Sequence, residues 1–295
     1  MRRNLLRRFS PIIPDKLFVE LMYKIETGRK LNLDNPVTMN EKLQWLKLYN
    51  RNPEYTTIVD KITVKDYIAN RLGSEYVIPI IDIWNSTKEI DFAKLPKQCV
   101  IKTNHSGGNK GVIICKDKDQ LNINDTINRL NQSLKTDLNR IYREWPYKNV
   151  QKRIFAEEYL GDDLVDYKFY CYNGHVDAVL LCIDRQIGAP KFYFFDKEWN
   201  LKRYNKRGKE APEGFTLPKP ENIDKMFELA SQLSEGYPFV RVDFYNVNGR
   251  IYFGEMTFFP ASGYDTKRLP ESASTSSARL TSPPVSCGSQ PASSK

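Results

Sequence analysis

Residues 240–263 read VRVDFYNVNGRIYFGEMTFFPASG, and this stretch predicts a β-hairpin. Apolar and polar side chains alternate through Val240–Val247 and again through Arg250–Phe258, as they do in strands that bury one face. Asn248 and Gly249 separate the two segments, and both residues tolerate the positive φ of a tight two-residue turn. We therefore expect two antiparallel strands closed by an Asn-Gly turn.

Charged side chains occur on both strands of the predicted hairpin. Arg241 and Asp243 lie on the first strand, and Glu255 lies on the second. Pairing of the strands brings the two carboxylates together beside the arginine. Mg²⁺ binds a few carboxylate oxygens and completes its shell with water and phosphate, so the hairpin is a candidate metal clamp. A solvated hairpin with ordinary surface charges fits the same spacing.

The composition is that of a folded protein with anionic partners. The chain has 295 residues, of which 40% are hydrophobic and 12% aromatic, enough for a substantial core and too apolar for wholesale disorder. Its 45 Lys and Arg residues against 36 Asp and Glu residues give a formal charge of +9. That excess indicates a nucleotide, a nucleic acid, an acidic sugar or a membrane surface as partner.

Cysteine and histidine usage excludes several classes of site. The 5 cysteines contain no CxxC pair, which argues against a zinc site and a disulfide framework and favours reduced thiols in a cytoplasmic protein. With only 2 histidines, a histidine-rich metal centre or a Ser-His-Asp hydrolase is not expected.

The N-terminal segment, residues 1–14, reads MRRNLLRRFSPIIP. It has no small-residue cleavage site, and nowhere in the chain is there an apolar run of the length that spans a bilayer. Its arginines and apolar residues suit peripheral contact with the anionic inner face of a membrane. A frayed basic terminus is the alternative.

Residues 15–95 are expected to form a helical or mixed N-terminal region. Apolar spacing predicts helices within residues 15–50 and a further helix over Ile58–Leu72, which Gly73 ends. The following YVIPIIDIW is a strand near a sheet edge because Pro79 lacks an N–H to donate. Residues 266–295 are rich in serine, and we expect them to be a disordered tail outside the fold.

A glycine-rich loop lies within residues 99–115, CVIKTNHSGGNKGVIIC. Lys102 ends the first strand, and Gly107, Gly108 and Gly111 allow backbone N–H groups to approach a phosphate. The loop returns to a strand, so it is neither a Walker A loop nor a dinucleotide fingerprint. A structural hairpin tip is the simpler reading of the same residues.

Two further predicted segments carry charge inside β patterns. Arg153–Leu160 reads as a strand that ends in acidic residues, and Asp166–Arg185 as a hairpin closed at Asn173-Gly174. Lys168 lies within this pattern, where it either faces solvent or needs an anionic partner. Amphipathic helices are expected within residues 117–150 and over Ile223–Leu233.

Taken in order, these segments resemble the ATP-grasp superfamily, and within it the TupA-like branch associated with teichuronopeptide biosynthesis. The resemblance covers about Tyr23 to Gly263 and rests on KTNHSGGNKG, AEEYL with DYKF, and RVDFY followed by GRIYFGEMT. It implies an α+β fold in which two α+β subdomains, residues 96–265, grip a nucleotide after the N-terminal region.

The resemblance also implies a role for each matching residue. Lys65 and Lys102 reach the phosphates, the loop from His105 closes over them, Glu157–Leu160 form the hinge that reads adenine, and Asp166 contacts the ribose. The implied cofactor-binding residues are Lys65, Lys102, His105, Ser106, Gly107, Gly108, Glu157, Glu158, Tyr159, Leu160 and Asp166. Arg241 and Lys168 are the implied catalytic residues, and Asp243, Glu255 and Thr257 the metal ligands. Thr257 departs from the asparagine that many ATP-grasp ligases have there.

The implied activity is that of a ligase using ATP and Mg²⁺ to join a carboxylate to an amine through an acyl-phosphate. The branch implies an acidic sugar or amino-acid substrate in bacterial surface or capsular polysaccharide synthesis. A glycosyltransferase or other polysaccharide-modifying enzyme is the alternative, although the sequence has no obvious DxD triplet. A nucleic-acid-binding module is disfavoured because no basic aromatic platform recurs.

Overall fold

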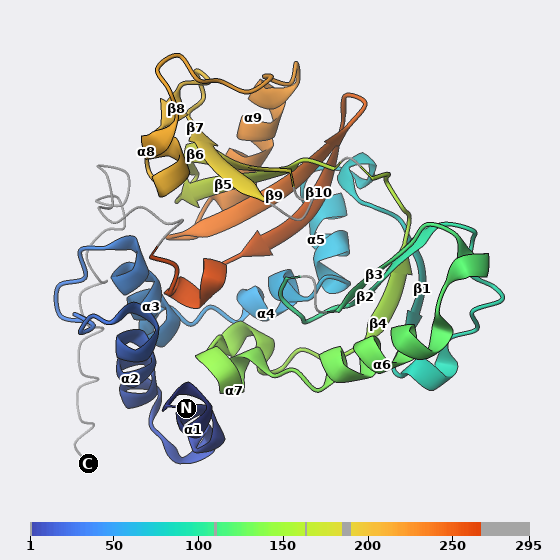
Figure 1. The fold of residues 1–295 in the computed structure, drawn as a ribbon, viewed down its shortest axis with the longest axis horizontal. Coiled ribbons are helices and arrows are strands. Elements are labelled where there is room, and N and C mark those ends of the chain that lie inside the picture. Colours follow the sequence, from blue (N-terminus) through green and yellow to red (C-terminus); the bar gives the residue numbers. More distant parts are fainter. Residues whose placement is uncertain (1, 109–110, 163, 185–189, 267–295) are drawn as a thin grey trace, which may run out of the picture.

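The computed structural model describes residues 2–108, 111–162, 164–184 and 190–266. Two antiparallel sheets form separate layers of the fold, with helices packed around them (Figure 1). Apart from residue 266, the predicted serine-rich tail lies outside the described residues, as does Cys287. No helix in these four ranges has the length and apolar character needed to cross a membrane.

The larger sheet has six strands in the order β10-β9-β5-β6-β7-β8. Its strands are β5 (Asp166–Tyr172), β6 (His175–Ile183), β7 (Lys191–Phe195), β8 (Leu201–Lys202), β9 (Val240–Val247) and β10 (Arg250–Thr257). Helix α9 (Ile223–Ser234) packs on β5, β6 and β9, and its buried Met226, Phe227 and Leu233 join the main hydrophobic core. Short α8 (Lys206–Glu210) lies beside β7.

The predicted hairpin is confirmed as β9 and β10. Asn248 and Gly249 have φ of 52° and 80°, as the tight turn requires. A β-bulge at Gly254 shifts the register, so that Tyr252 lies opposite Tyr245 but Glu255 lies opposite Asp243. The bulge brings Glu255 and Thr257 onto the face of β9 that carries Arg241 and Asp243, because one extra residue reverses the alternation of side chains.

The smaller sheet has four strands in the order β1-β4-β2-β3. Its strands are β1 (Ile80–Trp84), β2 (Cys99–Thr103), β3 (Val112–Cys115) and β4 (Ile154–Glu157). One face packs against α6 (Ile123–Leu134), whose Leu130 is fully buried. Helix α7 (Leu138–Tyr142) follows. The predicted edge position of the Pro79 segment is confirmed, because β1 is the outer strand.

Strand β1 also bears on the expected subdivision of the chain. The sequence places a boundary between residues 95 and 96, but β1 pairs with β4 over Ile80–Trp84 and Ile154–Glu157. Hydrogen bonding of the smaller sheet therefore crosses that boundary, since a strand from the N-terminal region completes the sheet.

The expected helix over Ile58–Leu72 is two helices, α4 (Glu54–Val59) and α5 (Thr63–Arg71). Asp60 breaks the helix: its Oδ1 accepts from the backbone N–H of Ile62 at 2.9 Å. The N–H of Lys61 donates to the carbonyl of Asn104 at 3.1 Å, outside any helix. Aspartate competes for backbone donors in this way, which a count of apolar spacing does not register.

Three helices form the N-terminal corner: α1 (Arg2–Arg8), α2 (Asp15–Thr27) and α3 (Met39–Tyr49). They enclose a small core of their own that includes Leu6, Phe18 and Met22. Helix α3 begins with a capping box between Thr38 and Glu41, which satisfies backbone donors at the helix start.

A buried lysine attaches α3 to the turn η6 (Pro260–Gly263) that follows β10. Lys47 is fully buried, and its Nζ donates to the Ser262 carbonyl and to Gln44 Oε1, both at 2.8 Å. Ser262 Oγ in turn bonds Glu144, a buried carboxylate whose charge acts on Lys47. Ala261 and Ser262 have φ of 49° and 54°, so this network holds the turn in a left-handed conformation unusual for residues other than glycine.

We predict that Lys47→Met lowers the free energy of unfolding by about 3–5 kcal/mol, because it leaves the Glu144 carboxylate buried without its cation. Urea unfolding measures the change. Lys24→Met, at an exposed lysine of α2, is the matched control and should change stability by less than about 0.5 kcal/mol. Combining Lys47→Met with Glu144→Gln should recover part of the loss, and a cost of Lys47→Met equal to the control would contradict the assignment.

Candidate active site

Arg241 joins both carboxylates of the hairpin. Its Nε and Nη2 donate to Asp243 at 2.6 and 2.7 Å, and the same Nη2 donates to Glu255 Oε1 at 2.6 Å. Thr257 Oγ1 donates to Glu255 Oε1 at 3.1 Å and accepts from Arg241 at 3.1 Å. The sequence-predicted catalytic arginine and all three predicted metal ligands therefore meet at one point on the sheet.

Strand β5 adds a second cation to this cluster. Lys168 lies opposite Asp243 in the β5–β9 register, and its Nζ is 2.6 Å from Asp243 Oδ2. The same Nζ is 3.5 Å from Asp166 Oδ2. Of the two alternatives left open for Lys168, the structure shows the second: only 13% of its side chain is exposed, and it has anionic partners.

The two hairpin carboxylates differ in their proton affinity. Burial raises the pKa of Asp243 although Arg241 and Lys168 oppose it. Burial also acts to raise the pKa of Glu255, but the charges of Lys61, Arg241 and Lys168 outweigh it and lower the pKa to about 2. Glu255 is therefore ionised at neutral pH, and with 35% of its side chain exposed it is the more open of the two.

A second ionic cluster lies on the smaller sheet. Lys65 Nζ donates to Glu157 Oε2 at 2.9 Å and to the carbonyl of Ile78 at 2.6 Å, while Lys102 pairs with Glu157 Oε1. Burial acts to raise the pKa of Glu157, but the charges of Lys102 and Lys65 lower it. The two lysines assigned to phosphate are thus held by one buried carboxylate, and Lys102 is the more exposed, at 18% against 11%.

Lys61 lies between the two clusters, and the sequence analysis missed it. Its Nζ donates to the carbonyl of Ser106 at 2.7 Å and lies 3.8 Å from Glu255 Oε2. Burial lowers the pKa of Lys61, while the charges of Glu255, Asp60 and Glu157 oppose that shift. The local signal for its position was Asp60, whose side chain ends α4 and turns the next residue toward the glycine-rich loop.

The glycine-rich loop is anchored at both ends. His105 and Ser106 are buried, whereas Gly107 and Gly108 are exposed. Thr103 Oγ1 donates to Ser106 Oγ at 2.7 Å and lies 2.6 Å from Ser133 Oγ. A Cβ on Gly111 would lie 2.2–2.5 Å from these three hydroxyl oxygens, so the glycine is needed for packing there. Of the loop residues assigned to the nucleotide, only Gly107 and Gly108 are open to solvent.

The predicted hinge leaves the smaller sheet beside an apolar face that is only partly exposed. The N–H of Glu158 already donates to the carbonyl of Pro79 at 3.1 Å. Cross-strand register puts Val100 opposite both Glu157 and Ile114, and opposite residues share a face of a sheet. Val100 is half-buried, and Ile114, one strand further from Glu157, is 57% exposed, so part of this face is apolar and open on the side away from α6. The remaining hinge residues, Tyr159 and Leu160, are half-buried.

The donor set of the hairpin fits Mg²⁺. One cationic nitrogen, Arg241 Nη2, bonds Asp243 Oδ2 and Glu255 Oε1 together, which shows that both carboxylates reach a common point. Among the residues that the structure describes, no group of three His, Cys, Asp or Glu side chains gathers to hold a metal. Two carboxylates and the Thr257 hydroxyl leave coordination positions for water and phosphate, as Mg²⁺ prefers.

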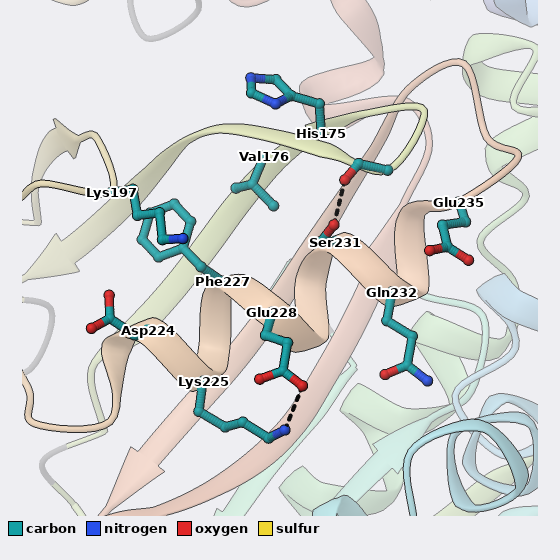
Figure 2. Close-up of a pocket in the computed structure, with 11 residues that line it drawn as sticks. His175, Val176, Lys197, Asp224, Lys225, Phe227, Glu228, Ser231, Gln232 and Glu235 are labelled. Atoms are coloured by element: carbon teal, nitrogen blue, oxygen red, sulfur yellow. Dashed lines mark hydrogen bonds and ion pairs between the residues drawn. The ribbon is translucent and has the colours of Figure 1, made fainter.

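A large surface hollow lies elsewhere. It has a volume of about 750 Å³ and is lined by residues of α9 and of the Asn173-Gly174 turn, among them His175, Lys225 and Glu228 (Figure 2). Lys225 pairs with Glu228 at 2.7 Å along its edge. No residue assigned to catalysis, nucleotide or metal lines this hollow.

Comparison with protein families finds a match that covers most of this chain. The model of the family described as TupA-like ATP-grasp matches residues 41–273. That range contains every residue assigned above to nucleotide, metal or catalysis. No curated protein sequence matches.

Similar solved structures include several ligases and synthetases. D-alanine–D-alanine ligase from Helicobacter pylori is 13% identical with a TM-score of 0.46, over 82% of this chain and 68% of that one. L-amino acid ligase from Bacillus licheniformis is 13% identical with a TM-score of 0.43, over 76% and 49%. N5-carboxyaminoimidazole synthetase from Staphylococcus aureus, complexed with ADP, is 14% identical with a TM-score of 0.40, over 68% and 44%. The chain thus spans less than half the length of the last two.

We predict that His105 titrates near pH 4. Burial, and then the charge of Lys152, lowers its pKa from 6.5 to about 4. The unfolded state therefore binds the proton more readily between these values, and stability falls by roughly 3 kcal/mol as the pH drops from 6.5 to 4. His105→Gln should flatten this part of the pH–stability curve.

Proton NMR of the imidazole ring checks the pKa directly, because the chain has only 2 histidines. His175→Gln, at the exposed histidine, assigns the signals and serves as the matched control for the stability curve. A titration of His105 near pH 6.5 would show that its ring is not buried as described.

Proposed function

Because the chain belongs to the TupA-like ATP-grasp family, we propose that it is a ligase that uses ATP to activate a carboxylate and joins it to an amine. The observation that carries this proposal is the meeting of Arg241, Asp243, Glu255 and Lys168 on one sheet, linked by Lys61 to the glycine-rich loop on the other. A single polyanion such as ATP could contact both the carboxylates proposed to hold a metal and the neighbouring cations.

The nucleotide is proposed to bind across the two sheets. The apolar surface of Val100 and Ile114 suits a flat purine, and backbone groups of the hinge, residues 157–160, are proposed to bond its edge. From there the phosphates extend past Lys102 and Lys61 toward the hairpin. Lys61 supports this path between the two sheets, because it bonds the glycine-rich loop and lies 3.8 Å from Glu255.

Asp243, Glu255 and Thr257 would hold Mg²⁺. Bound there, the ion would offset the negative charge of the phosphates. The ion pairs of the two clusters, within the described residues, include the cations Lys61, Lys65, Lys102, Lys168 and Arg241 and the carboxylates Asp166, Glu157, Asp243 and Glu255. The cations are fixed before substrate arrives, so little reorganisation is needed when charge develops on the transferring phosphoryl group.

The proposed reaction has two steps. An oxygen of the substrate carboxylate attacks the γ-phosphorus of ATP, and the bond to the β-phosphate oxygen breaks to release ADP. The amine then attacks the carbonyl carbon of the acyl-phosphate, phosphate leaves, and the amine nitrogen loses a proton to give an amide. Arg241 and Lys168 are proposed to stabilise the charge on the phosphoryl oxygens in both steps.

An acidic sugar or an amino acid is the proposed carboxylate, in bacterial surface or capsular polysaccharide synthesis. The family to which the chain belongs and its formal charge of +9 support this choice. Release of ADP in the presence of a panel of uronic acids, amino acids and amines is the direct test. Thermal stabilisation by a UDP-sugar but not by ATP would instead favour a glycosyltransferase.

We predict that Asp243→Asn and Glu255→Gln each reduce ADP formation by at least roughly 10²-fold, because each removes one charged ligand of the clamp. The loss should be in kcat at saturating ATP and should not be restored by more Mg²⁺. Asp224→Asn and Glu228→Gln, exposed acids on α9, make the same chemical changes and should leave the rate unaltered. Full activity of both clamp variants would rule out this site.

We predict that Lys61→Met also reduces ADP formation by roughly 10²-fold, chiefly through weaker ATP binding, since it removes a cation between the two sheets. Lys65→Met should act differently, because Lys65 is bonded to Glu157 and to a backbone carbonyl: its main effect should be a lower melting temperature. Measuring the KM for ATP and the thermal unfolding of both variants separates the two roles. If instead Lys65→Met raises the KM for ATP and Lys61→Met lowers the melting temperature, then Lys65 rather than Lys61 contacts the phosphates.

A further inference from the structure

We propose that the N-terminal corner is a docking surface for an anionic phospholipid membrane. The surface, here called the N-terminal face, consists of the exposed apolar side chains Leu5, Phe9, Ile12, Leu17, Leu21 and Ile25, with the exposed basic side chains Arg8, Lys16 and Lys24. It lies on α1, the short turn η1 (Ser10–Ile12) and α2, and none of its residues takes part in the proposed reaction.

Exposed apolar residues are concentrated there. Twelve large hydrophobic side chains are exposed in the described residues, and six of them fall between residues 5 and 25. Ile12 is the most exposed of all, at 78%. Leu17, Leu21 and Ile25 follow each other at intervals of four residues, which places them in one stripe along α2. Single exposed apolar residues are ordinary, but such a concentration marks an interaction surface.

The exposure of Phe9 and Ile12 is built into the fold. Buried Arg143 donates through Nη2 to the carbonyls of Ser10 and Ile13, at 2.6 and 2.9 Å. Its guanidinium also lies 4.2 Å from the ring centre of Phe18 on α2. The turn is therefore fixed on both sides of Ile12, and the side chain stays outside although the chain around it is ordered.

The charges around the N-terminal face match an anionic surface. Residues 1–30 contain eight basic and three acidic residues. Two of the acids are paired: Asp15 with Arg143 and Arg51, at 2.7 and 2.9 Å, and Glu26 with Arg3, at 3.5 Å. The basic excess attracts anionic headgroups while the apolar side chains enter the interfacial region. The same excess opposes pairing of this face with a second copy, since like charges repel.

The face lies at one corner of the molecule, separated by α3 from the larger sheet (Figure 1). Helix α3 packs on both α2 and the turn η6, which follows β10. A protein bound through this corner would keep both ionic clusters away from the membrane contact. The inference is therefore independent of which carboxylate or amine the site takes.

Co-sedimentation of the full chain with phosphatidylcholine vesicles, with and without phosphatidylglycerol, tests the proposal. We expect binding only to the anionic vesicles, weakening as salt is added. Phe9→Ser combined with Ile12→Ser should reduce the partition coefficient by at least about tenfold. Arg8→Gln, Lys16→Gln and Lys24→Gln together should reduce it by about 10²-fold, since each basic residue near such a surface contributes about one kcal/mol.

Two control variants make the result specific. Ile123→Ser removes an isoleucine that is 44% exposed on α6, and the triple change Lys206→Gln, Lys209→Gln and Lys225→Gln alters charge equally at exposed lysines on α8 and α9. Both should bind vesicles as the unaltered protein does, and all variants should keep its melting temperature. Absence of binding to anionic vesicles, or equal loss in the controls, would overturn the proposal. So would a dimer in solution that Phe9→Ser with Ile12→Ser makes monomeric, because a second copy would then cover the face.

Discussion

Pairing of buried charge is the constraint on which this structure depends. Arg241, Asp243 and Lys168 lie on the larger sheet with at most 13% of each side chain exposed. Each would destabilise the fold if it lacked a partner of opposite charge. Their mutual contacts follow from register: Lys168 lies opposite Asp243 on β5, and the bulge at Gly254 turns Glu255 to the same face. The fold therefore keeps these cations and carboxylates in place, as the proposed site for a charged nucleotide and a metal requires.

The helices extend this constraint beyond the sheets. The break between α4 and α5 brings Lys61 from the N-terminal region into contact with the glycine-rich loop and near Glu255. Lys47 on α3 fixes the turn that follows Thr257, through the carbonyl of Ser262. The N-terminal region is thus part of the site's framework. Its outer side, where Arg143 fixes the turn that exposes Ile12, is the surface proposed to dock on a membrane.

Much of the local structure could be predicted from sequence. The hairpin of β9 and β10, the Asn-Gly turns, α9 and the edge strand β1 all follow from short-range patterns that bury one face. The expected TupA-like ATP-grasp family is confirmed by the match over residues 41–273. The expected single helix over Ile58–Leu72 was wrong, because the side chain of Asp60 bonds the backbone and stops the helix. The roles assigned to individual site residues remain predictions.

The sequence by itself determined which residue types were available: two carboxylates and an arginine on one hairpin, a glycine-rich loop and several lysines in strands. Only the tertiary structure decided which of them meet. It paired Lys65 and Lys102 with Glu157, placed Lys61 near Glu255, and buried His105 and Ser106 while leaving Gly107 and Gly108 open. The physical reason is that local patterns reflect one element's own burial, whereas the partner of a buried charge comes from a strand or helix far away in the chain.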